Sequence, residues 1–487
     1  MIGRALGLAV VLSSPAVAES PLNAKGGAVL SAVTCPFSGS DVPAGYQVAC
    51  SRMAWQDHGI DFRTSVAVFT PEEASTDALP VIYIPGGPGD APVTAEPNLD
   101  NVLSLFPGHA LITLNPRGVK GAEPRPKCVF DDDFWHEELS SQRETEIAAG
   151  CRDQIDLDLT VFDAPYLARD ISRMVTVLGV KRAGVFGVSY GTESILHLLS
   201  APPKWLQLAI MDSVSLPGAL DIRGRLAARD RFLGVIDRLC FEEKQCPESV
   251  TDEHNTLIAW AAQFDDAPIE ITLGPDGAPW SLDGEEVIDF LASMTSYPDG
   301  AGYGPVFIDS LTWSRESTAP WIATELSASF EYALENFALL FGAFSDSTER
   351  TLPTPKRGST RYPFNVDDQR ESMRLFKVWN RSGRNEARFA GREVKPSALG
   401  IPVLVLSGGV DSLTPVEWAD DLERRFSGMT RFVFPELGHA VAFGTDADVT
   451  DSHIVKQLNC GPDVVRAFVS NKDYGTCARY MRKATDD

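Results

Sequence analysis

The chain of 487 residues carries 67 acidic and 43 basic side chains, which gives a formal net charge of −24 at pH 7. Hydrophobic residues make up 44% of it, enough for one large core with an inserted or second domain, so we expect a folded and not a disordered chain. The acidic surplus argues against nucleic acid as a partner, because phosphate backbones repel a negative surface.

The first 18 residues have the pattern of a secretory signal peptide. Arg4 supplies the positive start, residues 5–12 form a short apolar centre, and residues 16–18 (AVA) match the small-residue cleavage pattern. The apolar centre is too short to span a bilayer, and no later uninterrupted apolar run approaches the ~20 residues that a transmembrane helix needs. We therefore expect a protein that is exported to the periplasm or the medium, begins at Glu19 after cleavage and has no membrane span.

Eight cysteines fit an exported chain, because oxidising compartments favour disulfides and an even number permits complete pairing. Zinc is the competing interpretation, but no local couple of cysteines has C-x-x-C spacing or a nearby pair of histidines, so we expect no metal site. We predict a disulfide within each of four local couples: Cys35 with Cys50, Cys128 with Cys151, Cys240 with Cys246, and Cys460 with Cys477.

The first half of the chain predicts strands at residues 60–70, 81–84 and 110–114, where apolar and β-branched residues alternate or cluster. The loop after the second strand, residues 85–89 (PGGPG), leaves backbone N–H groups uncovered that can form one arm of an oxyanion hole. Proline has no N–H, so Gly86 or Gly87 must supply the donor, and we favour Gly87. Arg117 follows the third strand and is expected to hold a carboxylate or loop carbonyls in place.

A helix is expected from Asp163, which can cap it, to Gly179, which ends it. A strand at residues 183–188 then leads into Gly187-Val188-Ser189-Tyr190-Gly191, and an apolar helix follows. G-x-S-x-G between a strand and a helix is typical of a nucleophile elbow, because the serine occupies a strained turn that only small neighbours allow. Ser189 is therefore the candidate nucleophile, and the backbone N–H of Tyr190 is the candidate second oxyanion donor.

One further strand is predicted at residues 206–211, after which strands and helices stop alternating. Residues 216–399 contain helical stretches rich in aromatic residues and are interpreted as an inserted, mostly helical cap. A separate second domain is the alternative, but strand patterns resume at residues 401–406 and 431–434, which an insertion explains better. The core of the protein is then expected to comprise residues 19–215 and 400–487.

Asp411 lies just past the strand at residues 401–406, and His439 follows the strand at residues 431–434. The chain order Ser189, Asp411, His439 is that of an α/β-hydrolase triad and differs from the orders of the familiar serine proteases. Alone, an aspartate after a strand often caps a turn and a loop histidine is often solvated. Together they favour catalysis, in which His439 takes the proton of Ser189 and Asp411 orients His439.

Several segments resemble the tripeptidyl aminopeptidase and proline iminopeptidase branch of the α/β-hydrolases. They are residues 85–89 (PGGPG), 115–118 (NPRG), 187–192 (GVSYGT), Asp411 with 414–415 (TP), and 438–439 (GH); Cys460 and residues 474–477 (YGTC) are similar to the C-terminal extension of that branch. The resemblance implies an α/β-hydrolase fold with a mostly parallel central sheet and a large helical cap. It also implies hydrolysis of peptides from the N-terminus through an acyl-enzyme, without a metal or an organic cofactor.

Two other functions share parts of this pattern. A carboxylesterase acting on small esters uses the same triad and oxyanion hole, so only its substrates discriminate it from a peptidase. A binding protein on an inactive hydrolase scaffold is disfavoured, because no member of the triad is missing. An exopeptidase also needs a carboxylate for the free α-amino group of its substrate. The candidates are Glu193, shortly after Ser189, and the acidic residues Glu325, Glu331 and Glu335 of the expected cap.

Overall fold

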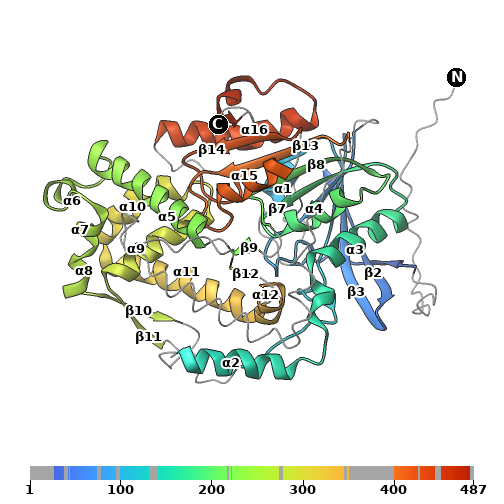
Figure 1. Cartoon of the computed structure of the whole chain (residues 1–487), viewed down its shortest axis with the longest axis horizontal. Helices are drawn as coiled ribbons and strands as arrows, with labels where there is room; N and C mark the ends of the chain where they lie inside the picture. Colours follow the sequence, from blue (N-terminus) through green and yellow to red (C-terminus); the bar gives the residue numbers. More distant parts are fainter. Residues whose placement is uncertain are drawn as a thin grey trace.

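A computed structural model describes residues 27–37, 42, 44–73, 78–94, 99–130, 141–216, 219–220, 222–273, 278–344, 348–349, 400–425, 428–444 and 451–482. The expected signal peptide and residues 350–399 of the expected cap lie outside this part of the chain. Figure 1 shows a central sheet flanked by helices and, beside it, a group of helices from the middle of the chain.

The central sheet contains eleven of the described strands, in the order β1-β2-β3-β5-β4-β7-β8-β13-β14-β15, with β6 beside β3. Strands β5, β4, β7, β8, β13 and β14 run parallel to one another, whereas β1, β2, β3 and β15 pair antiparallel with their neighbours. The sheet is therefore mostly parallel, as predicted. Its strands are β1 Val29–Val33, β2 Tyr46–Asp57, β3 Ile60–Pro71, β4 Val81–Ile84, β5 Leu111–Leu114, β6 Ala122–Glu123, β7 Ala183–Val188, β8 Leu206–Asp212, β13 Val403–Gly408, β14 Thr430–Phe434 and β15 Met481–Arg482.

The sequence predicts the central strands but not β1, β2, β6 or β15. Every residue of β4, β5, β7 and β13 is buried, because helices cover both faces of a parallel sheet, and such strands contain continuous apolar runs. In β2 only three of the twelve residues are buried, so it lacks such a run. The strands β6 and β15 have two residues each, too short for any pattern.

Helices cover the two faces of the sheet. Apolar residues of α1 (Leu99–Leu105) and α16 (Ser452–Val469) join one buried cluster, and those of α3 (Ala164–Val177), α4 (Gly191–Ser200) and α15 (Val416–Arg425) join the other. Helix α3 begins after Asp163 as expected, with a proline in its first turn, but the side chain of Asp163 forms no capping hydrogen bond. No helix in the described part of the chain is long and apolar enough to cross a membrane.

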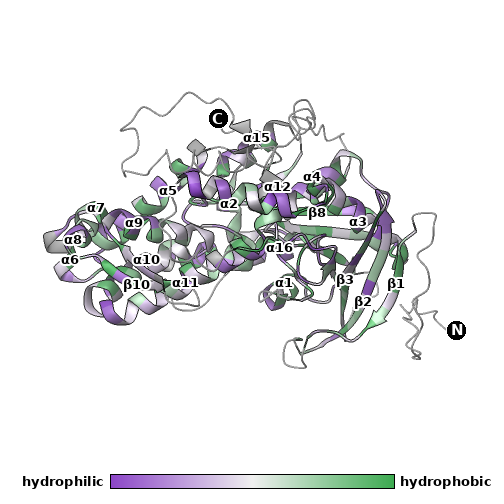
Figure 2. Cartoon of the chain, turned by 90° about the horizontal axis from the view of Figure 1, so that it is seen from below, coloured by the Kyte–Doolittle hydropathy of each residue, from purple (hydrophilic) through white to green (hydrophobic). Residues whose placement is uncertain are grey.

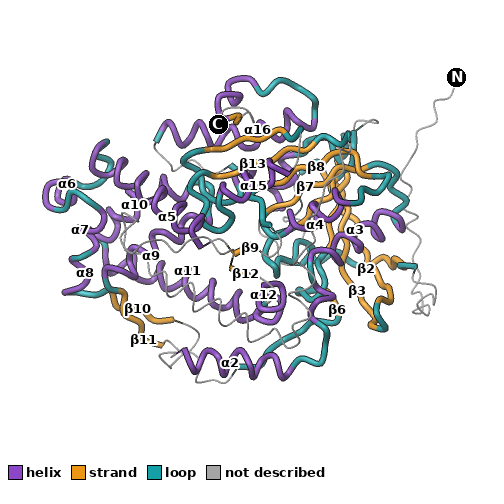
Figure 3. The backbone as a smooth tube through the Cα atoms, in the orientation of Figure 1, coloured by secondary structure: helices purple, strands orange, loops and turns teal. Residues whose placement is uncertain are grey.

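The middle of the chain forms a largely helical region, which Figure 3 shows beside the sheet. Hydrophilic and hydrophobic residues alternate along these helices (Figure 2). Most of their buried apolar side chains belong to the same cluster as those of α1 and α16, whereas Ala338 and Leu339 belong to two smaller clusters. Helix α11 leads from this region towards α12 (Figure 1). The elements are α5 Ile222–Asp237, α6 Glu248–Glu253, α7 Leu257–Ala261, α8 Gln263–Asp266, α9 Gly284–Ser293, α10 Gly300–Trp313, α11 Arg315–Glu335 and α12 Phe337–Phe344, with β9 Ala219–Leu220, β10 Ile269–Leu273, β11 Ala278–Leu282 and β12 Thr348–Glu349; α2, Ser141–Gln154, precedes them.

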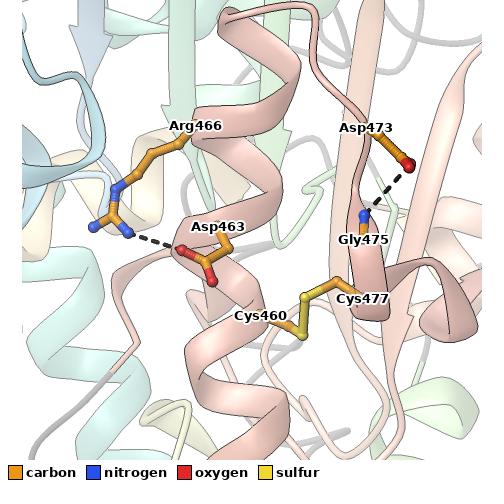
Figure 4. Close-up of a disulfide and its surroundings, with 6 residues drawn as sticks. All are labelled: Cys460, Asp463, Arg466, Asp473, Gly475 and Cys477. Atoms are coloured by element: carbon orange, nitrogen blue, oxygen red, sulfur yellow. Dashed lines mark hydrogen bonds and ion pairs between the residues drawn. A yellow bond between two sulfur atoms is a disulfide. The ribbon is translucent and has the colours of Figure 1, made fainter.

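The four predicted disulfides are all present, and each joins two cysteines that are 6 to 23 residues apart in the chain. Figure 4 shows how Cys460 of α16 is joined to Cys477, which belongs to the short helix Gly475–Tyr480. On α16 an ion pair of 3.1 Å connects Arg466 with Asp463. The bridge ties the end of the chain to α16, close to where β15 pairs with β14. Four disulfides fit a protein that folds in an oxidising compartment.

Candidate active site

Ser189 lies on the turn between β7 and α4, with a φ of 53° in the left-handed region. The two flanking glycines are required by close packing. A Cβ on Gly187 would lie 2.8 Å from Cδ1 of Ile195, and a Cβ on Gly191 would collide with the carbonyl oxygens of Ile84 and Pro85. The strain at Ser189 and the lack of side chains on both sides are the features that a nucleophile elbow requires.

His439 and Asp411, which are 28 residues apart in the chain, meet at a distance of 2.8 Å between Nδ1 and Oδ2. Asp411 is fully buried at the end of β13, and its Oδ1 accepts hydrogen bonds from the N–H groups of Leu413 and Thr414. Its Oδ2 also accepts a hydrogen bond of 2.6 Å from the hydroxyl of Thr414. These bonds fix the carboxylate, so that Oδ2 faces the imidazole and can accept a hydrogen bond from it.

The backbone around His439 is held from the helical region. The N–H of His439 donates to the carbonyl of Thr295 at 2.8 Å, and that of Gly438 donates to the carbonyl of Pro298 at 3.0 Å. A Cβ on Gly438 would collide with the carbonyl oxygen of Tyr297, so this approach requires a glycine. The loop that carries the imidazole is therefore positioned jointly by the sheet and by the helical region.

Asp212, at the end of β8, connects the loop of His439 to the turn of Ser189. Its carbonyl accepts from the N–H of Ser189 at 3.0 Å, and its Oδ2 accepts from the N–H of Ala442 at 2.8 Å. The next residue, Ser213, accepts from the N–H of Ala440 through its hydroxyl. No hydrogen bond joins the Ser189 hydroxyl to His439 among the described residues, and such bonds are often long before substrate binds.

Three carboxylates act on the imidazole of His439. Burial lowers the pKa of His439, but Asp411, Asp212 and Asp90 together raise it above its ordinary value of 6.5. Burial also raises the pKa of Asp212, to about 7, against the lowering effect of its hydrogen bond from Ala442. The site therefore places three carboxyl groups around one titratable base.

We predict that kcat/KM rises with pH through an apparent pKa above 6.5. His439 must be neutral to accept a proton, and the surrounding carboxylates stabilise its cation, so the active form becomes populated at higher pH than for a free imidazole. The measurement is kcat/KM against pH with an ester substrate that has no titrating group. A rising limb centred at or below pH 6.5 would contradict the electrostatic argument.

The loop of residues 85–89 follows β4 and passes directly beside the nucleophile. A Cβ on Gly86 would lie 3.2 Å from Cβ of Ser189, and Gly87 has a φ of 100° that favours glycine. Within the described part of the chain, the N–H groups of Gly86 and Gly87 donate no hydrogen bond to the protein. Both remain available as donors to a ligand, and Tyr190 opens α4 immediately after Ser189.

Two residues that the sequence analysis does not single out, Asp90 and Tyr332, also belong to this site. Asp90 follows the glycine-rich loop, and the hydroxyl of Tyr332 on α11 donates to its Oδ1 at 2.8 Å. A Cβ on Gly89 would lie 2.6 Å from Cγ of Asn336, so the C-terminal end of α11 packs directly against the loop. The sequence does place Asp90 directly after the glycine-rich loop, and an acidic residue beside a candidate oxyanion loop could have been recognised as a site residue.

Glu193, a candidate for binding the substrate amine, lies within the core. Its side chain is 7% exposed, and the hydroxyl of Ser215 donates to its Oε1 at 2.6 Å. Burial raises the pKa of Glu193 to about 7, although the hydrogen bond from Ser215 lowers it. A carboxyl group with this partner and this exposure is poorly placed to receive an ammonium group from outside.

The three glutamates of α11 have different surroundings. Glu335 forms an ion pair of 2.8 Å with Arg125, and Glu331 is exposed. Glu325 accepts a hydrogen bond of 3.3 Å from the hydroxyl of Tyr297, whose backbone touches the His439 loop. Through Tyr297, Glu325 is therefore connected to the loop that carries His439.

Arg117 has the supporting role that the sequence predicts. Its side chain donates to both carboxylate oxygens of Asp170, at 2.5 and 2.8 Å, and to Asp57 at 2.8 Å. The guanidinium carbon lies 4.0 Å from the ring centre of Phe62, and a further N–H donates to the carbonyl of Val161. Breaking such a buried network costs about 3–5 kcal/mol, so Arg117 is committed to holding the loop after β5.

The sheet order, with a serine on the strained turn after β7 and a buried His–Asp pair after β14 and β13, defines the α/β-hydrolase fold. The chain is similar to a tripeptidyl aminopeptidase from Streptomyces lividans, with 23% identity over 391 residues that cover 72% of this chain and 68% of the relative. The fold and this relative indicate a hydrolase. No protein-family model matches the chain.

Solved structures of enzymes are also similar to the chain. One is a serine hydrolase from Cycloclasticus zankles, with a TM-score of 0.40 and 12% identity, covering 87% of this chain and 98% of that chain. Another is a proline iminopeptidase from Mycobacterium smegmatis, with a TM-score of 0.34 and 17% identity, covering 84% of this chain and 95% of that chain.

Proposed function

We propose that the protein is an exported serine exopeptidase that releases amino acids or short peptides from the N-terminus of peptides. The observation that carries the proposal is the buried pair of His439 and Asp411 at 2.8 Å, tied through Asp212 to the strained turn of Ser189. The similarity to an aminopeptidase supports peptides as the substrate class. The four disulfides and the signal-like N-terminus support export.

The proposed reaction has two halves. His439 takes the proton of Ser189, whose Oγ attacks the substrate carbonyl, and the N–H groups of Gly87 and Tyr190 stabilise the oxyanion. The protonated His439 then gives its proton to the leaving amine, so the peptide bond breaks and an acyl-enzyme remains. Water, deprotonated by His439, attacks this ester and releases the acid, which restores Ser189. Asp411 orients the imidazole and stabilises its cation throughout.

The proposed cap restricts which substrates reach the serine. Residues 216–399 would form it, over a core of residues 19–215 and 400–487, with α11 nearest the glycine-rich loop. A cap that closes over one end of a substrate admits chain ends more readily than chain interiors. An exopeptidase uses this arrangement directly, because only a free N-terminus then enters the site.

The alternative is a carboxylesterase that uses the same residues on small esters. The discriminating experiment offers the enzyme an unblocked peptide, the same peptide with an N-acetyl group, and a p-nitrophenyl ester. We expect the enzyme to release N-terminal fragments from the unblocked peptide and to lose most of this activity on the acetylated peptide. Mass spectrometry of the products measures both. Turnover of the ester with both peptides left intact would establish the esterase instead.

A further inference from the structure

We infer that Asp90 binds the α-ammonium group of the substrate beside the nucleophile, and that the enzyme therefore releases one residue per cleavage. This inference rests on the proposed exopeptidase function and deepens it. It assigns the recognition of the N-terminus to the segment that follows the glycine-rich loop of the core, whereas the candidates expected from the sequence are Glu193 and the glutamates of α11.

The first support is the position of the Asp90 carboxylate. Its Oδ2 lies 3.3 Å from the point that a Cβ on Gly86 would occupy, and Cβ of Ser189 lies 3.2 Å from the same point. The carboxylate and the nucleophile therefore flank one small volume next to the scissile carbonyl. Together with Asp411 and Asp212, Asp90 also raises the pKa of the His439 imidazole, against the lowering effect of burial.

The second support is that Asp90 is held in place with one oxygen left over. Tyr332 donates to Oδ1 at 2.8 Å, so the tyrosine fixes the carboxylate through the oxygen that is not next to Ser189. The segment that follows is also fixed, since Asn115 accepts from the N–H of Val93 at 2.7 Å. Among the described residues, no donor bonds to Oδ2 and no lysine or arginine forms an ion pair with Asp90.

The third support is the balance of charge. Asp411, Asp212 and Asp90 all act on the single imidazole of His439, and burial raises the pKa of Asp90. Asp90 is half-buried, and a carboxylate in such a place that pairs with no lysine or arginine of the described residues is stabilised when a ligand supplies a cation. The α-ammonium group of a peptide is such a cation, and it lies close to the first peptide carbonyl.

The length of the substrate follows from covalent geometry. In one residue, the amino nitrogen and the carbonyl carbon are separated by the Cα alone, a distance of about 2.5 Å, and each further residue adds up to about 3.3–3.6 Å. A carboxylate beside Ser189 therefore reaches the ammonium group of the residue whose carbonyl is attacked. The ammonium group of a tripeptidyl substrate would lie roughly 7 Å farther away.

The test uses two esters that differ by one amino group, L-alanine methyl ester and methyl propionate. The readout is the ratio of their kcat/KM values, which cancels any general loss of activity in a variant. We expect the wild type to prefer the alanine ester, and Asp90→Asn to reduce the ratio by about 10- to 100-fold, the usual worth of a hydrogen bond to a charged group. Tyr332→Phe should reduce it in the same direction but less.

Two glutamates of α11 serve as controls. Glu331→Gln removes an exposed carboxylate next to Tyr332 and should leave the ratio unchanged, whereas Glu325→Gln tests the competing anchor. An unchanged ratio in Asp90→Asn, or a collapse of the ratio in Glu325→Gln alone, would overturn the assignment of Asp90. A wild type that hydrolyses both esters but no unblocked peptide would instead refute the exopeptidase proposal, and the ester ratio would still report on Asp90.

The number of residues released is tested separately with arylamides. The wild type should cleave alanine p-nitroanilide with a higher kcat/KM than trialanine p-nitroanilide, and the first product of the longer substrate should be free alanine. Direct release of trialanine as the main product would show that the ammonium group is bound farther from Ser189 than Asp90 allows.

Discussion

Replacing Ser189 with alanine should reduce kcat by about 10⁶-fold, on peptide and ester substrates alike. Without the hydroxyl no acyl-enzyme forms, and the oxyanion donors and the binding site can support only direct attack by water. The loss is measured as kcat in steady state, together with covalent labelling by a fluorophosphonate probe. The wild type should be labelled at Ser189 and Ser189→Ala should not be labelled.

A second serine variant provides the control for this prediction. Ser172 lies on α3, where its hydroxyl donates to the carbonyl of Ala168, and Ser172→Ala should keep both activity and labelling. Circular dichroism of both variants then separates a chemical loss from a failure to fold. Equal labelling of the wild type and Ser189→Ala would place the nucleophile on another residue.

The central strands and the candidate triad could be predicted because their signals are local. Strands such as β7 and β13 are buried along their whole length and therefore contain continuous apolar runs. Ser189 lies between glycines that close packing requires, so the motif itself carries the geometry. Asp411 follows β13 and His439 follows β14, which is buried except at its first residue, and parallel strands bring their ends to one edge of the sheet.

The surroundings of the triad could not be predicted, because they depend on contacts between distant segments. Tyr332 reaches Asp90 across 242 residues of chain, and no local pattern in α11 indicates which loop it faces. The same limit applies to Glu193, since only the fold reveals that Ser215 is its partner. Strand β2, which lies between β1 and β3, has no clear sequence pattern for a different reason, because most of its side chains are exposed or only partly buried.

The three carboxylates around His439 raise the question of which one is the acid of the triad. Asp212 ends β8 and accepts from the backbone of Ala442 and from Ser213, so its oxygens are engaged in holding the loop. Asp90 is held by Tyr332. Of these three carboxylates, only Asp411 forms a hydrogen bond with the imidazole within the described part of the chain, at Nδ1 and 2.8 Å, where the Thr414 hydroxyl also lies at 3.2 Å. The geometry therefore favours Asp411 over its two neighbours.

Changing Asp411 to asparagine should lower kcat by about 10⁴-fold, as loss of the orienting carboxylate does in serine proteases. An amide in this position can donate to Nδ1 and so favours the imidazole tautomer that cannot accept the proton of Ser189. The variant also removes the main charge that raises the pKa of His439, so the rising limb of the remaining activity should move to lower pH. Steady-state kinetics against pH measures both effects.

Two further variants make this prediction specific. Thr414→Val removes one hydrogen bond to Oδ2 of Asp411 but leaves the carboxylate, so its loss of kcat should be nearer to tenfold. Asp212→Asn keeps an oxygen that can accept from Ala442, and should therefore retain far more activity than Asp411→Asn. Only the carboxylate that holds the imidazole in its basic tautomer is indispensable. If Asp212→Asn abolished activity while Asp411→Asn kept more than a tenth of it, the acid of the triad would therefore be Asp212 at the end of β8.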